Sequence, residues 1–358
     1  MAQLAMIREE LVEKHGWISG DKFKKSVAIY QLLPGPEAHE MCVHIGTMKG
    51  GRIGGLIAGL AFMTPGFLLM LAFANLYQHF GKERLFPLFL FTTPIITALI
   101  VRAVHRLGSH AITGYRSFVP LIGSIILTSL NIHFTIVFVI AALWETLWIK
   151  RKKKLAIGLC VGLAAIAIFA QQNFFAQKHF EFFPNKSAST SIFLTGLKGG
   201  MLSFGGAYTA IPVVHDDMVD KYPSISHETF LDSLAIGSII PSPLVIFATF
   251  LGYIAGGLPS AILITIGIFL PAFLFSMTGF ELMEKLVENK TLHSILEGIS
   301  VAVIGLLVVT AFHIFVNTIN TNASVIAFAL GLALFYKVKK NWIAPVAIIG
   351  AALLGALV

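Results

Sequence analysis

Charged residues are scarce in this sequence. Only 12% of its 358 residues are Asp, Glu, Lys or Arg, whereas soluble domains usually carry about 25%. The hydrophobic share is 56%, and the mean hydropathy is +0.82. This composition cannot cover a surface that faces water on every side. The sequence therefore predicts an all-α, polytopic membrane protein.

Cysteine and recognisable enzyme motifs are also scarce. The two cysteines, Cys42 and Cys160, lie in apolar stretches, so no disulfide framework is expected. The sequence has neither a Walker-type phosphate loop nor a paired CxxC motif, which argues against ATP-driven pumping and against that kind of metal site. We therefore expect that the protein binds no cofactor and is not an enzyme. The polar run from Arg8 to Lys25 also predicts that no signal peptide is cleaved.

The net positive charge of the chain has two interpretations. Its net charge of +8 comes from 26 basic and 18 acidic residues, which in a soluble protein would suggest nucleic-acid binding. In a membrane protein, basic residues gather in cytoplasmic loops, and the run 150–154 is typical of such a loop. We therefore expect no nucleic-acid partner.

Apolar segments recur along the chain, and most are long enough to cross a bilayer. They lie at 26–48, 53–78, 85–107, 118–131, 132–149 and 155–175, and again at 191–214, 231–255, 259–283, 295–318, 323–336 and 341–358. Two of them, 118–131 and 323–336, have only 14 residues. These two could be tilted, re-entrant or halves of a helical hairpin.

An internal repeat relates the two sets of segments. At an offset of 207 positions, residues 9–14 align with 216–221 and residues 32–36 with 239–243. After a one-residue slip, further glycines and prolines align. These pairs are Gly50 with Gly256, Gly51 with Gly257, and Pro65 with Pro271. Shared hydrophobicity does not produce such matches, so we predict two homologous halves.

The repeat suggests boundaries and an orientation. We predict a first half at 1–150, a linking helix and connector at 151–190, and a second half at 191–358. Paired repeats joined by an extra apolar segment are typical of transporters with inverted topology. Loop 7–25 carries five basic residues and its counterpart 215–230 carries one, which favours opposite sides of the membrane.

The repeat also predicts a missing element. In the second half an apolar segment comes just before the acidic stretch 216–221, and its first-half counterpart would precede Met1. We expect either that the natural chain is longer at this end or that this protein has lost the helix.

Each half carries two prolines inside an apolar segment. Proline removes a backbone donor, and it pushes the residue before it out of helical geometry. Two half-helices should therefore meet at each motif, although a simple kink is the alternative. Unwound backbone at membrane depth persists only against protein or a cavity, and matched interruptions indicate the transport site. The motifs are Pro34-Gly35-Pro36 and Pro241-Ser242-Pro243.

Further candidates flank these interruptions. Ser203, Gly205 and Gly206 could expose backbone N–H groups to an oxyanion, or could serve close helix packing. Lys198 could hold a divalent anion or could extend to the nearer interface.

Ionisable residues follow the first interruption. They are Glu37, His39, Glu40 and His44. Glu37 and Glu40 are three residues apart and Glu40 and His44 are four apart, as neighbours on one helix face are, and this arrangement could carry protons. The same residue types could bind a divalent metal, or they could lie at the membrane surface without a role. The second half has no matching ligands, which disfavours a metal.

These motifs resemble the chromate ion transporter family in its long two-half form. The residues that carry the resemblance are 9–14, 16–19, 33–38, 203–212, 241–253 and 267–273. The resemblance implies a multi-pass protein of the bacterial inner membrane that exports chromate and has halves of opposite orientation. The implied partners are chromate or sulfate and the lipid bilayer, and a homodimer is left open.

Together these arguments predict one substrate site without a metal. Its residues are Lys198, Ser203, Gly205, Gly206, Pro34, Gly35, Pro36, Glu37, Pro241, Ser242 and Pro243. Three alternatives remain: a transporter of sulfate or another oxyanion, an N-terminally truncated inactive member, and a membrane-embedded enzyme that uses residues 37–44.

Overall fold

The computed structural model describes residues 2–31, 33–112, 114–173, 188–203, 207–219, 225–278, 289–338, 340 and 342–357. All regular elements in these ranges are helical. Four helical stretches are long and apolar enough to cross a membrane: Glu37–Phe80, Pro87–Ser109, Leu244–Met277 and Thr291–Thr318. The prediction of an all-α polytopic membrane protein is confirmed.

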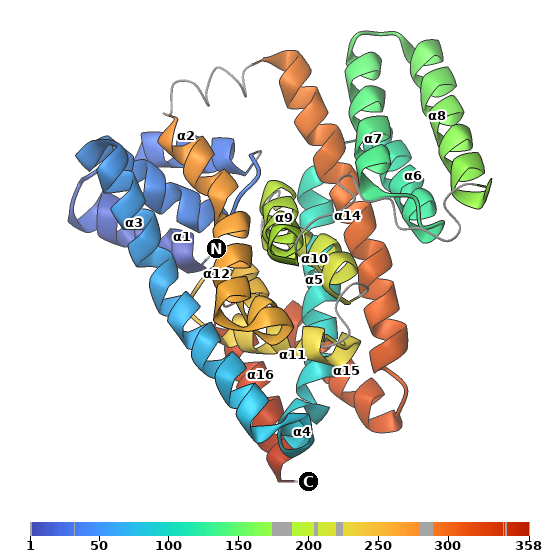
Figure 1. The fold of residues 1–358 in the computed structure, drawn as a ribbon. Helices are drawn as coiled ribbons and strands as arrows, with labels where there is room; N and C mark the ends of the chain where they lie inside the picture. The colour runs from blue at the N-terminus through green and yellow to red at the C-terminus, as the bar shows by residue number, and fades with distance from the viewer. Residues whose placement is uncertain are drawn as a thin grey trace. The chain divides into compact units, whose positions relative to one another are not determined.

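Helices from both halves of the sequence make up the fold (Figure 1). The first half contains α1 (Ala2–Ile7), η1 (Arg8–Lys14), α2 (Gly20–Tyr30), α3 (Glu37–Phe80), α4 (Lys82–Leu90), α5 (Thr92–Ala111), η2 (Tyr115–Ser117), α6 (Phe118–Ser129) and α7 (Phe134–Ile149). Helix α8 (Lys153–Asn173) follows. The second half contains α9 (Ala188–Met201), η3 (Ala207–Ala210), α10 (Ile211–Val219), α11 (His227–Ile239), η4 (Leu244–Ile246), α12 (Phe247–Met277), α14 (Lys290–Thr318), α15 (Asn322–Lys337) and α16 (Ile343–Ala356).

Matched caps begin the corresponding helices α2 and α11. The side chain of Ser19 accepts a hydrogen bond from the backbone N–H of Lys22, and that of Ser226 accepts one from Thr229. A serine at this position satisfies a donor that the first helical turn leaves free. Ser19 and Ser226 are 207 positions apart, so the repeat seen in the sequence is also present in the local structure.

Helices α3 and α12 share a sharp bend at the same place in the repeat. In α3, Gly51 has φ 60° and ψ −159°; in α12, Gly257 has φ 69° and ψ −161°. Residues with a side chain rarely adopt this conformation. The glycine before each, Gly50 or Gly256, is also non-helical but has negative φ. The bend therefore depends on one glycine in each half.

The chain reverses at each bend. A methyl group on Gly46 would lie 2.6 Å from both the Gly54 carbonyl oxygen and the Ala58 Cβ. In α12, a methyl group on Gly252 would meet the Ser260 carbonyl oxygen at 2.8 Å. The residues before and after each bend thus pack against one another, and both α3 and α12 are helical hairpins. Small residues at the crossing let the two backbones approach.

The short first limb of each hairpin corrects the predicted segments 26–48 and 231–255. Residues 37–49 make a limb of only roughly 20 Å, at about 1.5 Å per residue, against a hydrocarbon core of about 30 Å. Neither segment is a continuous span, because α2 ends at Tyr30 and α11 ends at Ile239 before the next helix begins. The predicted segment 191–214 is also wrong as one helix, since α9 ends at Met201 and α10 begins at Ile211.

The described helices belong to two compact units. Unit 1 comprises residues 1–103, 187–280 and 313–358, and unit 2 comprises 104–186 and 281–312. Each unit draws on both sequence halves, so the predicted half boundaries do not coincide with the compact units. The boundaries 1–150, 151–190 and 191–358 remain a prediction about the repeat.

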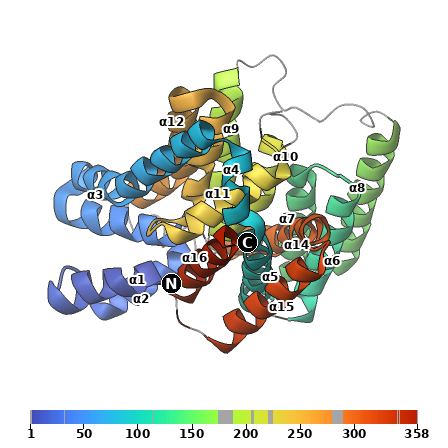
Figure 2. The ribbon, with the colours of Figure 1, turned by 90° about the horizontal axis from the view of Figure 1, so that it is seen from below.

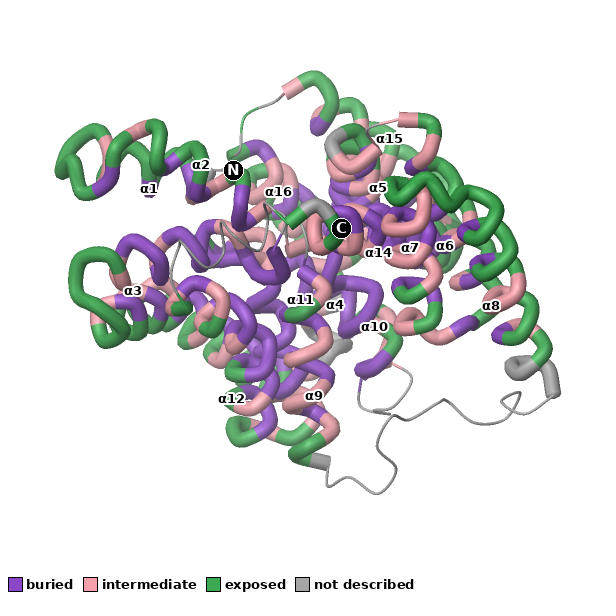
Figure 3. The backbone as a smooth tube through the Cα atoms, turned by 90° about the horizontal axis from the view of Figure 1, so that it is seen from above, coloured by how far each residue is buried: buried purple, intermediate pink, exposed green. Residues whose placement is uncertain are grey.

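Burial differs between elements of the two units. In unit 1, α12 packs chiefly against α9 and α3, and α11 is buried over most of its length (Figure 3). In unit 2, α7 packs against α6 and α8 (Figure 2). Helix α8 presents Leu155, Ile157, Val161 and Ile166 on its exposed surface. An exposed apolar face suits contact with lipid tails.

The hairpin bend gives a stability prediction. We expect Gly51→Ala to lower the free energy of unfolding in detergent by about 1–3 kcal/mol, because Ala strains this backbone conformation. Gly50→Ala is the matched control, since both positions have open space for a methyl group but Gly50 has negative φ. Denaturant unfolding followed by tryptophan fluorescence measures both variants. Equal stability of the two variants would contradict the assignment of the bend to Gly51.

Candidate functional site

The first proline motif lies between α2 and α3 and contacts the second half. Pro34, Gly35 and Pro36 are buried, and Gly35 has a φ of 152°. The backbone N–H of Gly35 donates to the carbonyl oxygen of Ser203 at 3.1 Å. Two elements that the sequence predicted separately, the first proline motif and Ser203, therefore meet in unit 1.

Each proline motif packs against the hairpin of the other half. A methyl group on Gly35 would lie 3.2 Å from the Cβ of Ala272 in α12, and one on Gly66 in α3 would collide with the side chain of Ser242. In the register of the repeat, Gly35 corresponds to Ser242, and Gly66 corresponds to Ala272. The two contacts are thus the same contact made reciprocally, as in a two-fold interface.

A helix starts directly after each motif. Pro36 is the N-cap of α3, and Pro243 is the N-cap of η4, which continues into α12. The first N–H groups of a helix have no partner within it, and the aligned peptide dipoles make this end positive. Both starts can therefore donate hydrogen bonds to an anion.

Two buried serine hydroxyls lie at the motifs. Ser203 is fully buried and Ser242 is 7% exposed, and neither hydroxyl has a hydrogen-bond partner within the described part of the chain. Buried polar groups are nearly always bonded to protein, water or ligand. These hydroxyls are therefore available to a ligand that reaches them. Pro243 is buried beside Ser242, whereas Pro241 is exposed.

Lys198 lies on α9 and pairs with an acidic residue of α10. Its Nζ is 2.7 Å from Oδ2 of Asp217, and the hydroxyl of Thr195 donates to the same oxygen at 3.0 Å. Thr195 and Lys198 are three residues apart, so they share one face of α9. The predicted anion-binding charge of Lys198 is thus already compensated by a carboxylate.

The first half places the corresponding acid differently. Glu10 aligns with Asp217 in the repeat, and it accepts a hydrogen bond from Lys14 on its own helix at 2.6 Å. Both side chains are exposed. The hydrogen bond from Lys14 lowers the pKa of the Glu10 carboxyl from its usual value. The two halves therefore share the acid but not its partner.

The ionisable residues after the first motif have different surroundings. His39 is fully buried among three phenylalanine rings, with centroid distances of 4.7 Å to Phe273 and 4.9 Å to Phe269. The ring of His44 lies 5.6 Å from that of Tyr30. Glu37 is half-buried, and Glu40 is fully buried. Among the described residues, no group of three or more His, Cys, Asp or Glu side chains could hold a metal ion.

Two predicted site residues cannot be placed, and some contacts in unit 1 were not predicted from the sequence. Gly205 and Gly206 lie outside the described residues. The sequence did not indicate Asp217 as the partner of Lys198, although Asp217 lies in the acidic stretch that revealed the repeat, and it did not indicate that Thr195 donates to the same carboxylate. It also missed the bond from the Tyr77 hydroxyl to buried Asp232, at 2.8 Å, which joins α3 to α11.

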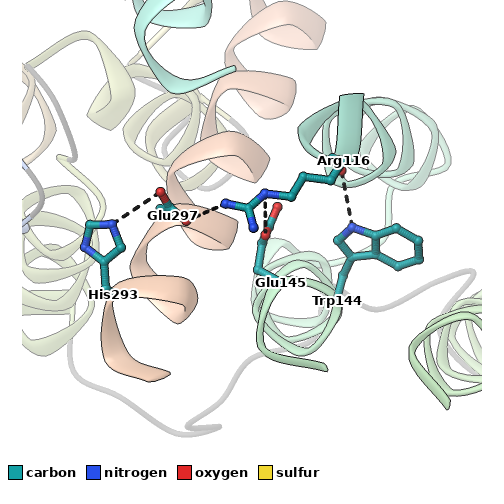
Figure 4. Close-up of polar contacts among 5 residues, drawn as sticks. All are labelled: Arg116, Trp144, Glu145, His293 and Glu297. Atoms are coloured by element: carbon teal, nitrogen blue, oxygen red, sulfur yellow. Dashed lines mark hydrogen bonds and ion pairs between the residues drawn. The ribbon is translucent and has the colours of Figure 1, made fainter. Parts of the chain in front are cut away.

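Unit 2 contains an ionic network that the sequence did not indicate (Figure 4). Arg116 lies between Glu145, at 3.7 Å, and Glu297, at 3.4 Å, and His293 is 3.3 Å from Glu297. The indole N–H of Trp144 donates to the Arg116 carbonyl oxygen. One arginine thus joins η2, α7 and α14 within this unit. We interpret this network as structural, because its contacts hold these elements together.

Comparison with known proteins agrees with the resemblance found in the sequence. The family described as chromate transporter matches residues 1–172 and 190–356. A chromate transport protein of Pseudomonas aeruginosa is 42% identical over 368 aligned positions, covering 100% of this chain and 88% of the relative. One from Cupriavidus metallidurans is 24% identical, covering 99% of this chain and 88% of its own length.

Shorter relatives match only part of the chain. An uncharacterized transporter of Bacillus subtilis is 26% identical over 132 residues, which is 37% of this chain and 72% of that protein. No solved structure matches the chain.

The Lys198–Asp217 pair gives a second prediction. In a double-mutant cycle with Lys198→Ala and Asp217→Ala, we expect a coupling of about 1–3 kcal/mol in the free energy of unfolding, because either single variant removes one member of a partly buried ion pair. The exposed Glu10–Lys14 pair is the control and should show far weaker coupling, because water screens it. A coupling no larger than that of the control would show that the inner pair is not a structural link.

Proposed function

This chain belongs to the chromate transporter family, and on that premise we propose that it carries chromate outward across the bacterial inner membrane. We propose further that the anion passes through the site formed by the two proline motifs in unit 1. The observation that carries this assignment is the reciprocal packing of the motifs, with unpartnered serine hydroxyls beside the starts of α3 and α12.

The chemistry of chromate suits these groups. Chromate is a tetrahedral dianion, so it needs several hydrogen-bond donors rather than a deep apolar pocket. The first N–H groups of α3 and the hydroxyl of Ser203 supply donors on one side of the first motif. Ser242 and the start of η4 supply the same types of donor at the second motif. Helix starts are common sites for oxyanions.

Lys198 has a conditional role in this proposal. Its ammonium group donates to Asp217, whose carboxylate also accepts from the Thr195 hydroxyl, so Lys198 contributes little net positive charge while the pair is closed. A dianion that reached Lys198 would compete with Asp217 for it. We therefore assign the first contacts of the anion to backbone N–H groups and hydroxyls, and only a later contact to Lys198.

The direction of transport follows from the membrane potential. A negative charge that leaves a negative-inside cell gains about 2.3 kcal/mol per 100 mV. Export of a dianion therefore needs no ATP. In this proposal the two halves have opposite orientations, which would let alternating access operate around one shared site. A homodimer is compatible with the proposal but is not needed for it.

Sulfate transport is the second candidate. Sulfate has the shape and charge of chromate, and nothing in the donor set separates the two anions. Uptake of radiolabelled chromate and sulfate by the same proteoliposomes measures their ratio. A much larger flux of sulfate would make chromate a secondary substrate without changing the site.

The transport site gives a third prediction. In everted membrane vesicles with a positive interior, chromate should accumulate inside, and Ser203→Ala should raise its KM roughly 10- to 100-fold. A hydrogen bond to a charged ligand is worth about 1.5–3 kcal/mol. Ser124→Ala is the matched control, because Ser124 is equally buried but its hydroxyl already donates to the Leu121 carbonyl. We expect its KM to be unchanged.

Two outcomes would contradict the proposal in different ways. Vesicles that do not accumulate chromate at any potential would exclude export. Accumulation with the same KM in Ser203→Ala and Ser124→Ala would preserve transport but place the site elsewhere.

A further inference from the structure

Glu40 is a buried carboxyl group without a partner. It is 0% exposed, and neither of its oxygens has a hydrogen-bond partner in the described part of the chain. It also makes no ion pair there. A methyl group on Gly35 would lie 2.6 Å from Oε1 of Glu40. The carboxyl therefore lies against the backbone of the first proline motif, one turn into α3.

Within the ranges that the structure describes, no positive charge compensates Glu40. Glu37, on its own helix, is the charged group that acts on it electrostatically. From α2, the titratable neighbour is the Tyr30 hydroxyl, and the unpartnered hydroxyl of buried Ser26 is on the same helix. On α12, the nearest residue to the motif is Ala272, and Ser276 lies near Tyr30.

The two histidines of α3 near Glu40, His39 and His44, and the residue Ser203 after α9 add no fixed charge. His39 packs against Phe269 and Phe273, and His44 packs against Tyr30. Ser203, whose carbonyl accepts from Gly35, presents only a hydroxyl.

An ionised carboxylate in these surroundings is costly. Burial of a charge without hydrogen bonds or a counter-ion is strongly unfavourable, and such a group becomes neutral instead. A dianion at the start of α3 would add repulsion at short range and low dielectric. The ionised form of Glu40 and a bound dianion should therefore exclude each other.

We propose that Glu40 is a proton-binding site whose protonation accompanies anion binding at the first proline motif. The inference rests on the proposed function, because it assumes that the anion binds at this motif. At a pH where the unliganded carboxyl is ionised, it takes up one proton from solution when the dianion binds, and it releases that proton when the dianion leaves. One O–H bond of the carboxyl forms and later breaks and no other bond changes, so one net negative charge crosses the membrane with each dianion.

Linkage makes this coupling measurable at equilibrium. If an anion favours protonated Glu40, then protonation must favour the anion by the same factor. Affinity should rise as the pH falls, with a limiting slope of about tenfold per pH unit for one proton. Proton uptake per bound anion should approach one at the alkaline end, where the unliganded carboxyl is ionised.

Isothermal titration calorimetry of the full chain in detergent tests the proposal. Sulfate is the probe, since it remains a dianion from about pH 6 to about pH 10, a range well above the usual pKa of a glutamate side chain. Titrations in buffers of different ionisation enthalpy report the number of protons taken up per sulfate. We expect this number to approach one in the wild type and to fall to about zero in Glu40→Gln, which should still bind sulfate. Glu10→Gln, which changes an exposed carboxyl on η1 away from the proline motifs, is the control and should retain proton uptake.

The possible results separate this inference from the proposed function. Sulfate binding by the wild type without proton uptake across the range would overturn the role of Glu40 and leave the anion site intact. Proton uptake that persists in Glu40→Gln would assign the proton to another group. Absence of sulfate and chromate binding would instead overturn the anion site on which the inference rests. If Glu40→Gln fails to fold, the wild-type titration still decides whether a proton accompanies the anion.

Discussion

Unit 1 depends on two small residues that each follow a matched proline. Gly66 comes directly after Pro65, and Ala272 comes directly after Pro271. Each receives the proline motif of the other half, Ser242 on Gly66 and Gly35 on Ala272. A larger side chain at either position would separate a motif from the hairpin that covers it. The close approach of the halves, and with it the placement of both helix starts, follows from this constraint.

The same contact explains why polar groups remain available in an apolar protein. The prolines interrupt the helices, so backbone donors at the starts of α3 and α12 are left without intrahelical partners. Packing of each motif against the opposite hairpin buries Ser203, Ser242 and Glu40, and their side chains have no hydrogen-bond partner among the described residues. A membrane protein retains such groups chiefly where they serve transport. In the proposed mechanism, the hydrogen-bond donors attract the anion, and an acid that can become neutral allows it to stay.

Much of this arrangement could be predicted from the sequence, because it depends on local chemistry. Proline and glycine act on their own backbone, so Pro34 and Pro36 marked an interruption and helped to indicate the family, and the repeated Gly50-Gly51 pair helped to indicate the two halves. Contacts between distant residues could not be predicted in the same way. The sequence showed Lys198 as an isolated charge, whereas the fold supplies Asp217 as its partner from a different helix. Likewise, reversal of the chain at Gly51 shortens the first limb of α3, and apolar length alone predicted a longer segment.

The most direct test of the central claim is to locate bound chromium. Anomalous diffraction at the chromium absorption edge, from crystals of the protein grown with chromate, would show the position of the ion. The account predicts a peak within hydrogen-bonding distance of the Ser203 hydroxyl and the first N–H groups of α3. A peak found only beside Arg116 of unit 2 or at exposed lysines, with the proline motifs empty at saturating chromate, would contradict it.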